Sequence, residues 1–175
     1  MLKKIAIVVV VALSIVVILA AMKPDTFRVE RSASIKAPPE KIFLLIDDFH
    51  RWDVWSPWEK RDPAMKRTHS GAQSGKGAVY EWDGNNDVGK GRMEILESTP
   101  PSKVYIKLDF IEPFEGHNTA TFTLRPEGGA TNVHWVMEGP ANFMSKLMQV
   151  FMSFDDMIGK DFEAGLANMK AAVER

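Results

Sequence analysis

The side chains best suited to chemistry in this 175-residue chain are those of Glu115, His117 and Arg92. Glu115 and His117 lie two positions apart in a strand-like segment, so a strand would turn both side chains to one face. A general base and the carboxylate that orients it need this geometry, and a nearby arginine can stabilise an oxyanion. The alternative is an ordinary polar pair at a strand end, in contact with solvent. Further polar candidates for the interior are Arg31, Glu94 and Asn118.

Metals, nucleotides and other cofactors are not expected. The four histidines lack ligand spacings such as HExxH or HxH, and the chain has no cysteine. The glycine pairs around Lys76 and Lys90 complete neither a dinucleotide-binding motif nor a P-loop, and no serine lies in GxSxG. The net charge is −1 at pH 7, and no run of Lys or Arg exceeds two residues, which argues against nucleic acid as a partner.

Three tryptophans, Trp52, Trp55 and Trp58, give the strongest sign of an apolar binding site. Three indoles within seven residues are more than one core usually takes as filler, so they indicate an aromatic wall. They could also close one end of the core, and we predict that at most one of them contacts a ligand. Strand alternation and helical spacing add further candidates. The predicted cavity residues are Trp52, Trp55, Tyr80, Trp82, Phe110, Trp135, Met144, Met148 and Phe151.

Methionines form a second line at helical spacing near the carboxy terminus. Met144, Met148 and Met152 follow one another at intervals of four residues. Flexible thioethers suit an apolar cavity of variable shape, and a loosely packed core explains the same spacing. A partly exposed methionine line could also enter a membrane surface or hold a partner helix.

The elements that must position these residues follow from periodicity. Apolar and polar residues alternate over residues 27–35, which predicts a half-buried strand interrupted by Arg31. Pro39 suits the first turn of a helix that runs through Ile46. Glycine, proline and asparagine then punctuate six strand-like segments, with hairpin turns at 83–86, 99–102 and 126–129. These six predicted strands are residues 66–70, 77–82, 91–98, 103–110, 117–125 and 131–138.

The carboxy-terminal segment changes to a helical period. Apolar residues from Phe143 to Val173 form a long stripe at helical spacing, which predicts an amphipathic helix on the sheet. Asn142 is a favourable N-cap, and the sequence from Ser153 to Asp156 resembles a capping box. The segment is therefore expected to bend near Ser153.

The amino terminus is predicted to be a membrane anchor. Residues from Ile5 to Met22 carry no charge and span about 27 Å as a helix, close to the thickness of a bilayer core. A cleaved signal peptide and a buried soluble helix are the alternatives, but the stretch is long and lacks a good cleavage site. We expect residues 1–24 to be anchor and hinge, and residues 25–175 to be one domain. Basic residues flank both ends of the helix almost equally, and the short tail favours a domain outside the cytoplasmic membrane.

Two pieces of the chain carry a family resemblance. The segment from Phe27 to Phe43 and the tryptophan segment from Trp52 to Trp58 resemble the opening of the polyketide cyclase/dehydrase branch of the START-related (SRPBCC) superfamily. The resemblance extends through 113–118, 133–135 and the terminal helix, and covers residues 26 to 173. It implies an α+β helix-grip fold, in which a curved antiparallel sheet of about seven strands wraps around a long carboxy-terminal helix and leaves a hydrophobic cavity between them.

Three functions are compatible with that resemblance. The first is a membrane-anchored domain that binds a hydrophobic small molecule or lipid without chemistry of its own. The second is a cyclase or dehydrase in which Glu115, His117 or Arg92 serves as acid, base or oxyanion partner. The third is an interaction module that presents its sheet or methionine line to a membrane-protein partner. The resemblance specifies a pocket and no reaction.

Overall fold

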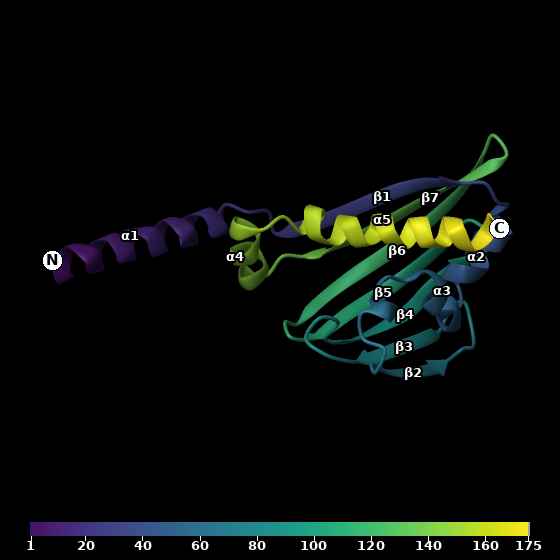
Figure 1. Cartoon of the computed structure of the whole chain (residues 1–175), viewed down its shortest axis with the longest axis horizontal. Coiled ribbons are helices and arrows are strands. Elements are labelled where there is room, and N and C mark those ends of the chain that lie inside the picture. Colours follow the sequence, from purple (N-terminus) through teal and green to yellow (C-terminus); the bar gives the residue numbers. More distant parts are fainter. Residues whose placement is uncertain (175) are drawn as a thin grey trace.

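The computed structural model describes residues 1–174, and its central feature is a seven-stranded antiparallel sheet (Figure 1). The strands follow the order β1-β7-β6-β5-β4-β3-β2, so only the first strand is out of sequence. This confirms the number and position of the predicted strands. Their bounds are β1 (Thr26–Ile35), β2 (Lys66–Gly71), β3 (Ala78–Asp83), β4 (Lys90–Thr99), β5 (Lys103–Glu112), β6 (Gly116–Glu127) and β7 (Ala130–Pro140).

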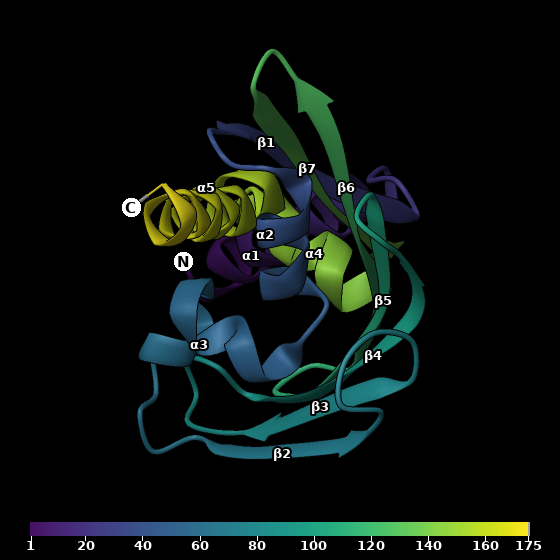
Figure 2. The ribbon, with the colours of Figure 1, turned by 90° about the vertical axis from the view of Figure 1, so that its right-hand side faces the viewer.

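Alternation of side chains gives the sheet one buried and one solvated face. In β5, Val104, Ile106 and Leu108 are buried, while Lys107 between them is exposed. Register shifts between β4 and β5 help the sheet to curl, and Figure 2 shows it wrapped around the terminal helix. The concave face is therefore lined by the apolar set that the alternation predicted.

The β6–β7 hairpin is longer than the sequence suggested. Pro126 and Glu127 were expected in the turn, but they pair with Thr131 and Ala130 as strand residues. The turn itself is the glycine pair at 128–129, with φ values of 57° and 83°. A two-residue hairpin turn of type I′ needs positive φ at both central positions, and glycine adopts it without strain.

Short helices connect β1 to the rest of the sheet and carry the tryptophans. They are α2 (Pro39–Ile46), η1 (Phe49–Arg51), α3 (Trp52–Trp55) and η2 (Trp58–Lys60). Pro39 occupies the start of α2, as its fixed φ favours. One side of α2 is buried through Ile42, Phe43 and Ile46, so this helix holds the tryptophan segment against the core.

The carboxy-terminal stripe forms two helices, α4 (Phe143–Phe151) and α5 (Phe154–Val173). The predicted bend is confirmed, because Met152 is extended and the Ser153 side chain accepts a hydrogen bond from the Asp156 amide. Asn142 caps α4 in the same way through the Ser145 amide. Each cap satisfies a backbone N–H that lacks a partner within its helix.

Helix α5 lies in the concave face of the sheet (Figure 2). Its buried residues include Phe162, Leu166 and Met169. Arg31 on β1 pairs with Asp155 at 2.8 Å and with Glu163 at 2.7 Å, so two carboxylates of α5 hold it to the first strand. The arginine that interrupts the apolar pattern of β1 therefore fixes the helix.

Helix α1 (Leu2–Ala21) projects from the domain (Figure 1). It is long and apolar enough to cross a membrane, with a mean hydropathy of 3.0, and a signal sequence has the same character. Its main contact within the chain is with α4. All but a few of its side chains are exposed, which leaves its apolar surface without a partner in the chain.

Candidate functional site

A cavity of about 710 Å³ lies between the concave face of the sheet, the tryptophan segment and the helices α4 and α5. Its volume falls within the range of about 300–1,000 Å³ that small-molecule sites occupy. Apolar and aromatic side chains form most of the wall. Six of the nine predicted cavity residues line it, namely Trp52, Tyr80, Trp82, Phe110, Trp135 and Met148.

The other three predicted cavity residues lie elsewhere. Trp55 is fully buried in the core behind the wall, while Met144 and Phe151 are 46% and 71% exposed on α4. Alternation and helical spacing identify a face but not the neighbour that covers it, so the prediction was wrong about where these three lie. Trp58, which was not among the predicted set, does line the cavity. We predicted that at most one of the three tryptophans contacts a ligand, and the two that can do so from the cavity wall are Trp52 and Trp58.

Two indoles of the tryptophan cluster complete helix α2. The Trp52 Nε1 donates to the Ile46 carbonyl at 3.1 Å, and the Trp55 Nε1 donates to the Leu45 carbonyl at 2.8 Å. Carbonyls in the last turn of a helix have no intrahelical donor, so these indoles supply what α2 lacks. The spacing of the tryptophans is thus set by helix termination as well as by the cavity wall.

Trp135 joins the sheet to α5. Its ring stacks on Phe162 at a centroid distance of 3.8 Å and on Phe122 at 4.7 Å. A side chain on Gly165 would approach the Trp135 ring to 3.0 Å, so the glycine permits this close packing. The Trp135 Nε1 is buried without a hydrogen-bond partner among the residues described. The centre of the cavity wall is consequently rigid and aromatic.

A polar cluster is embedded in the wall near the tryptophan segment. The Tyr80 hydroxyl donates to Glu59 at 2.5 Å, and Arg67 Nε donates to the other Glu59 oxygen at 2.6 Å. Burial raises the pKa of Tyr80, and the neighbouring Glu59 carboxylate raises it further. The tyrosine is therefore a neutral hydrogen-bond donor. Sequence reasoning found Tyr80 but missed Glu59 and Arg67, because no periodic pattern marks a pair eight residues apart across the turn between η2 and β2.

A second ion pair lies in the cavity wall. Arg61, which follows η2, pairs with Asp161 on α5, and both residues line the cavity. Their charges balance across the gap between the tryptophan segment and the terminal helix. No feature of the linear sequence pointed to this pair, because it depends on the packing of α5 against the loop.

Asn118 is the polar candidate that the structure places on the inner face. It is only 7% exposed, and it lines the cavity. A side chain at Gly139 on the neighbouring strand would come within 2.0 Å of the Asn118 Oδ1, so glycine leaves room for the amide. The amide offers both a donor and an acceptor to a polar group of a ligand.

The predicted catalytic residues are not gathered inside the cavity. Arg92 and Glu94 lie on the outer face of β4 and pair with each other at 2.8 Å. Glu115 and His117 do meet, at 3.3 Å, but at the cavity rim, where their side chains are largely exposed. His117 also contacts Asp109 at 2.8 Å, and this hydrogen bond raises the pKa of His117. Both ring nitrogens of this exposed imidazole are engaged, Nδ1 by Asp109 and Nε2 by Glu115, so neither is directed at a substrate inside the cavity.

The residues described, 1–174, contain no group of three or more His, Cys, Asp or Glu side chains placed to hold a metal ion. Several charged groups at the cavity are engaged in pairs, as in Glu59 with Arg67 and Arg61 with Asp161. The chemistry that the site offers is apolar contact with a small number of hydrogen bonds.

Comparison with known proteins gives the family and the fold. A family model described as polyketide cyclase/dehydrase and lipid transport matches residues 26–174. No curated protein matches the chain significantly. The fold is similar to that of protein CV1439 from Chromobacterium violaceum, with a TM-score of 0.61 and 19% identity over 87% of this chain and 99% of that one.

Two further solved structures have the same fold. The Aha1 dimer from Colwellia psychrerythraea has a TM-score of 0.61 and 17% identity, over 85% of this chain and 96% of that one. BexL, a di-domain ARO/CYC protein of the BE-7585A biosynthetic pathway, has a TM-score of 0.62 and 14% identity, over 91% of this chain and 53% of that one. Such low identities establish the helix-grip fold alone.

Proposed function

Because this chain belongs to the polyketide cyclase/dehydrase and lipid transport family, we propose that it is a membrane-anchored domain that binds a hydrophobic small molecule or lipid in its internal cavity. The observation that carries the proposal is the cavity of about 710 Å³ with an aromatic wall. Transfer of apolar ligand surface from water into such a wall is favourable by about 25 cal/mol per Å².

The polar groups at the cavity fit binding better than catalysis. Asn118 can orient the polar end of a ligand as donor or acceptor, and the Tyr80 hydroxyl, which already donates to Glu59, can still accept a hydrogen bond. Glu59 is held by Tyr80 and Arg67, so it is already engaged as an acceptor. A cyclase or dehydrase reaction needs an acid or base aimed at the substrate, and the residues first considered for it are Arg92 on the outer face and Glu115 with His117 at the rim. The proposal is therefore a binding domain without chemistry of its own.

Anchoring is proposed for α1. Its 20 residues give about 30 Å of helix, which matches the hydrocarbon core of a bilayer. Its exposed apolar surface supports insertion, because it contacts little of the domain.

The proposal is tested by recovery of ligand from the full chain. We expect protein purified in mild detergent from its native membrane to carry a reproducible apolar molecule, identified by mass spectrometry of the organic extract. Ala120→Phe, which fills the cavity from β6, should lose that molecule. The matched control is Thr121→Phe, one position along on the outer face, which should keep it. An empty cavity in the unsubstituted protein, or equal recovery from both variants, would contradict the proposal.

A further inference from the structure

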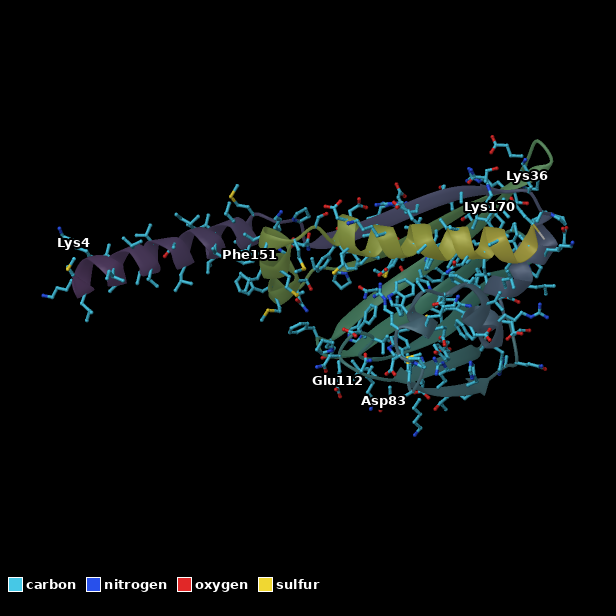
Figure 3. The ribbon with its side chains drawn as sticks, viewed as in Figure 1. Lys4, Lys36, Asp83, Glu112, Phe151 and Lys170 are labelled. Carbon is cyan, nitrogen blue, oxygen red and sulfur yellow. The ribbon has the colours of Figure 1, made fainter. Side chains whose placement is uncertain are left out.

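Exposed apolar side chains gather at the end of the domain where α1 joins it. They are between 46% and 71% exposed, and soluble proteins rarely leave so many large apolar groups together in water. Figure 3 shows Phe151 at this end, while Lys36 and Lys170 lie at the opposite end. This set, named here the apolar rim, comprises Phe114, Phe143, Met144, Phe151, Met152 and Met157.

Helix α4 carries half of the apolar rim, namely Phe143, Met144 and Phe151, and also borders the cavity. Ser145 and Met148 line the cavity, whereas Phe143, Met144 and Phe151 are exposed on other sides of the same helix. Phe114 and Met157 belong both to the rim and to the cavity lining, so the rim runs to the cavity mouth. One short helix therefore separates the cavity from whatever covers the rim.

The packing of α4 on α1 sets its depth relative to a membrane. The side chains of α1 that are not exposed are Val16 and Ala20, four positions apart, so they lie on one face. Val16 lies six residues before Met22, which places it about 9 Å inside the end of the apolar segment. Interfacial helices bury their apolar faces about 5–10 Å into the headgroup and acyl boundary. A helix that packs against this part of α1 reaches the same depth.

Two contacts fix α4 to the segment that leaves the membrane. Lys146 of α4 pairs with Asp25, and the Ala141 amide donates to the Asp25 carbonyl at 2.8 Å. The position of α4 is thus tied to the chain that directly follows α1. It does not depend on the apolar rim itself.

We propose that α4 lies in the surface of the membrane that holds α1, so that the cavity mouth opens directly onto lipid. The inference rests on the proposed function, because it takes α1 as the anchor and the cavity as a site for an apolar ligand. Apolar contact, and not attraction to anionic headgroups, would drive insertion. The charged side chains at the cavity mouth include the acidic Glu112 and Glu115, and the basic Lys146 on α4 is already paired with Asp25. The ligand then enters from the bilayer without crossing water.

A depth measurement on the full chain tests this arrangement. The sequence has no cysteine, so Phe151→Cys provides a single labelling site for an environment-sensitive fluorophore. In phosphatidylcholine vesicles, we expect blue-shifted emission and strong quenching by doxyl groups on the acyl chains. The control is Lys36→Cys at the far end of the domain, which should show neither effect. Addition of phosphatidylglycerol should change little, because apolar contact and not charge drives insertion.

The outcomes separate this inference from the proposed function. If the protein stays in the vesicles after alkaline washing and carries ligand, but the label at 151 is in water, α4 does not enter the membrane and the inference is wrong. If the label at 151 is shielded from water but crosslinks to a second copy or to a membrane protein, the rim is a protein interface and the inference is equally wrong. If the chain washes off, the anchor itself fails.

A rate measurement tests the consequence for ligand entry. Transfer of each phenylalanine side chain from lipid to water shifts a partition equilibrium by about tenfold or more. Uptake of a brominated lipid can be measured by the quenching of tryptophan fluorescence in the cavity. We therefore expect the double variant Phe143→Ser, Phe151→Ser to take up this lipid about tenfold more slowly, or slower still, with the final occupancy unchanged. Leu44→Ser, an exposed apolar position on α2, is the matched control and should not slow it. An unchanged rate in the double variant would overturn the inference.

Discussion

Single residues on the cavity wall combine packing and polar roles, and the glycines show this most clearly. A Cβ at Gly91 would lie 2.3 Å from the Trp82 ring, whose Nε1 donates to the Val88 carbonyl at 3.0 Å. That hydrogen bond holds the ring in this position. Gly91 on β4 thus leaves the space in which the Trp82 ring, from the neighbouring strand β3, lies against the cavity wall.

Gly91→Ala should destabilise the protein by about 1–3 kcal/mol, the usual cost of an overpacked core. For a domain of this size, that lowers the thermal midpoint by about 2–4 °C per kcal/mol. Differential scanning of the full chain in detergent checks this. Gly116→Ala is the control, because its Cβ meets no atom closer than 3.5 Å, and it should leave the midpoint nearly unchanged.

Tyr80→Phe should weaken the polar cluster. The Glu59 side chain is 8% exposed, so a lost donor leaves part of a buried carboxylate unsatisfied, at a cost of about 1–3 kcal/mol. Chemical unfolding of the full chain measures the change. A smaller loss in a Glu59→Gln background would show that the hydroxyl acts through the carboxylate, whereas an equal loss would show that it does not.

His69 should make stability fall as the pH is lowered. Burial, and then the charge of the stacked His50, lower the pKa of His69 below the value of about 6.5 expected in the unfolded chain. The unfolded chain therefore takes up a proton first, and folding stability declines as pH falls from about 7 through the folded pKa. Unfolding of His69→Gln between pH 5 and 8 should show a smaller decline than that of the unsubstituted protein.

His117 provides the opposite case. Its pKa is raised by Asp109, so its contribution is fully present below about pH 6.5 and is lost as pH rises through the folded pKa. His117→Asn should therefore differ most from the unsubstituted protein at low pH and converge with it above neutrality. Convergence at low pH instead would contradict the assignment.

At the scale of elements, periodicity in the sequence was sufficient for the sheet and the terminal helices. Alternation and the spacing of turn residues located all seven strands, because most of them bury one face and leave the other in water, while the edge strand β2 is marked mainly by the turn after it. The caps at Asn142 and Ser153 located the break between α4 and α5. The apolar stripe from Phe143 to Val173 could not show that α4 packs on α1 instead of on the sheet, because α4 and α5 have the same apolar pattern.

The contact between β1 and α5 gives a test at this scale. Glycine in a helix interior is about 1 kcal/mol less favourable than alanine, so Gly159→Ala ought to stabilise α5. A Cβ there would lie 2.0 Å from the Arg31 guanidinium and displace it from Asp155 and Glu163. Because exposed ion pairs contribute about 0–1 kcal/mol, we expect the two effects nearly to cancel.

Removal of the Arg31 side chain should leave only the helix-propensity effect of Gly159→Ala. In an Arg31→Ala background, Gly159→Ala should stabilise the protein by about 1 kcal/mol, and unfolding of all four chains completes the cycle. Equal effects in both backgrounds would mean that the guanidinium relaxes without loss.

At the scale of the whole molecule, the site comes from segments that only the fold brings together. The Glu59–Arg67 and Arg61–Asp161 pairs join the tryptophan loop to an edge strand and to α5. No pattern in the sequence marks these pairs, because most charged residues, in loops as on strands and helices, face solvent. The aromatic wall could be predicted from residue type and alternation, but its polar partners required three-dimensional packing.

The same scale decides whether anchor and domain are separable. The main contact of α1 is with α4, while the core of the domain is closed by α5 and the sheet. A chain that begins at Asp25 keeps the contacts of Asp25 with Lys146 and Ala141, so we expect its thermal midpoint to lie within about 4 °C of the full chain. The apolar rim is still present in this chain. It should therefore bind phosphatidylcholine vesicles reversibly in a flotation assay, whereas addition of Phe143→Ser and Phe151→Ser should abolish binding. A shortened chain that fails to fold would place the domain boundary elsewhere, and one that folds but never floats would remove α4 from the membrane surface.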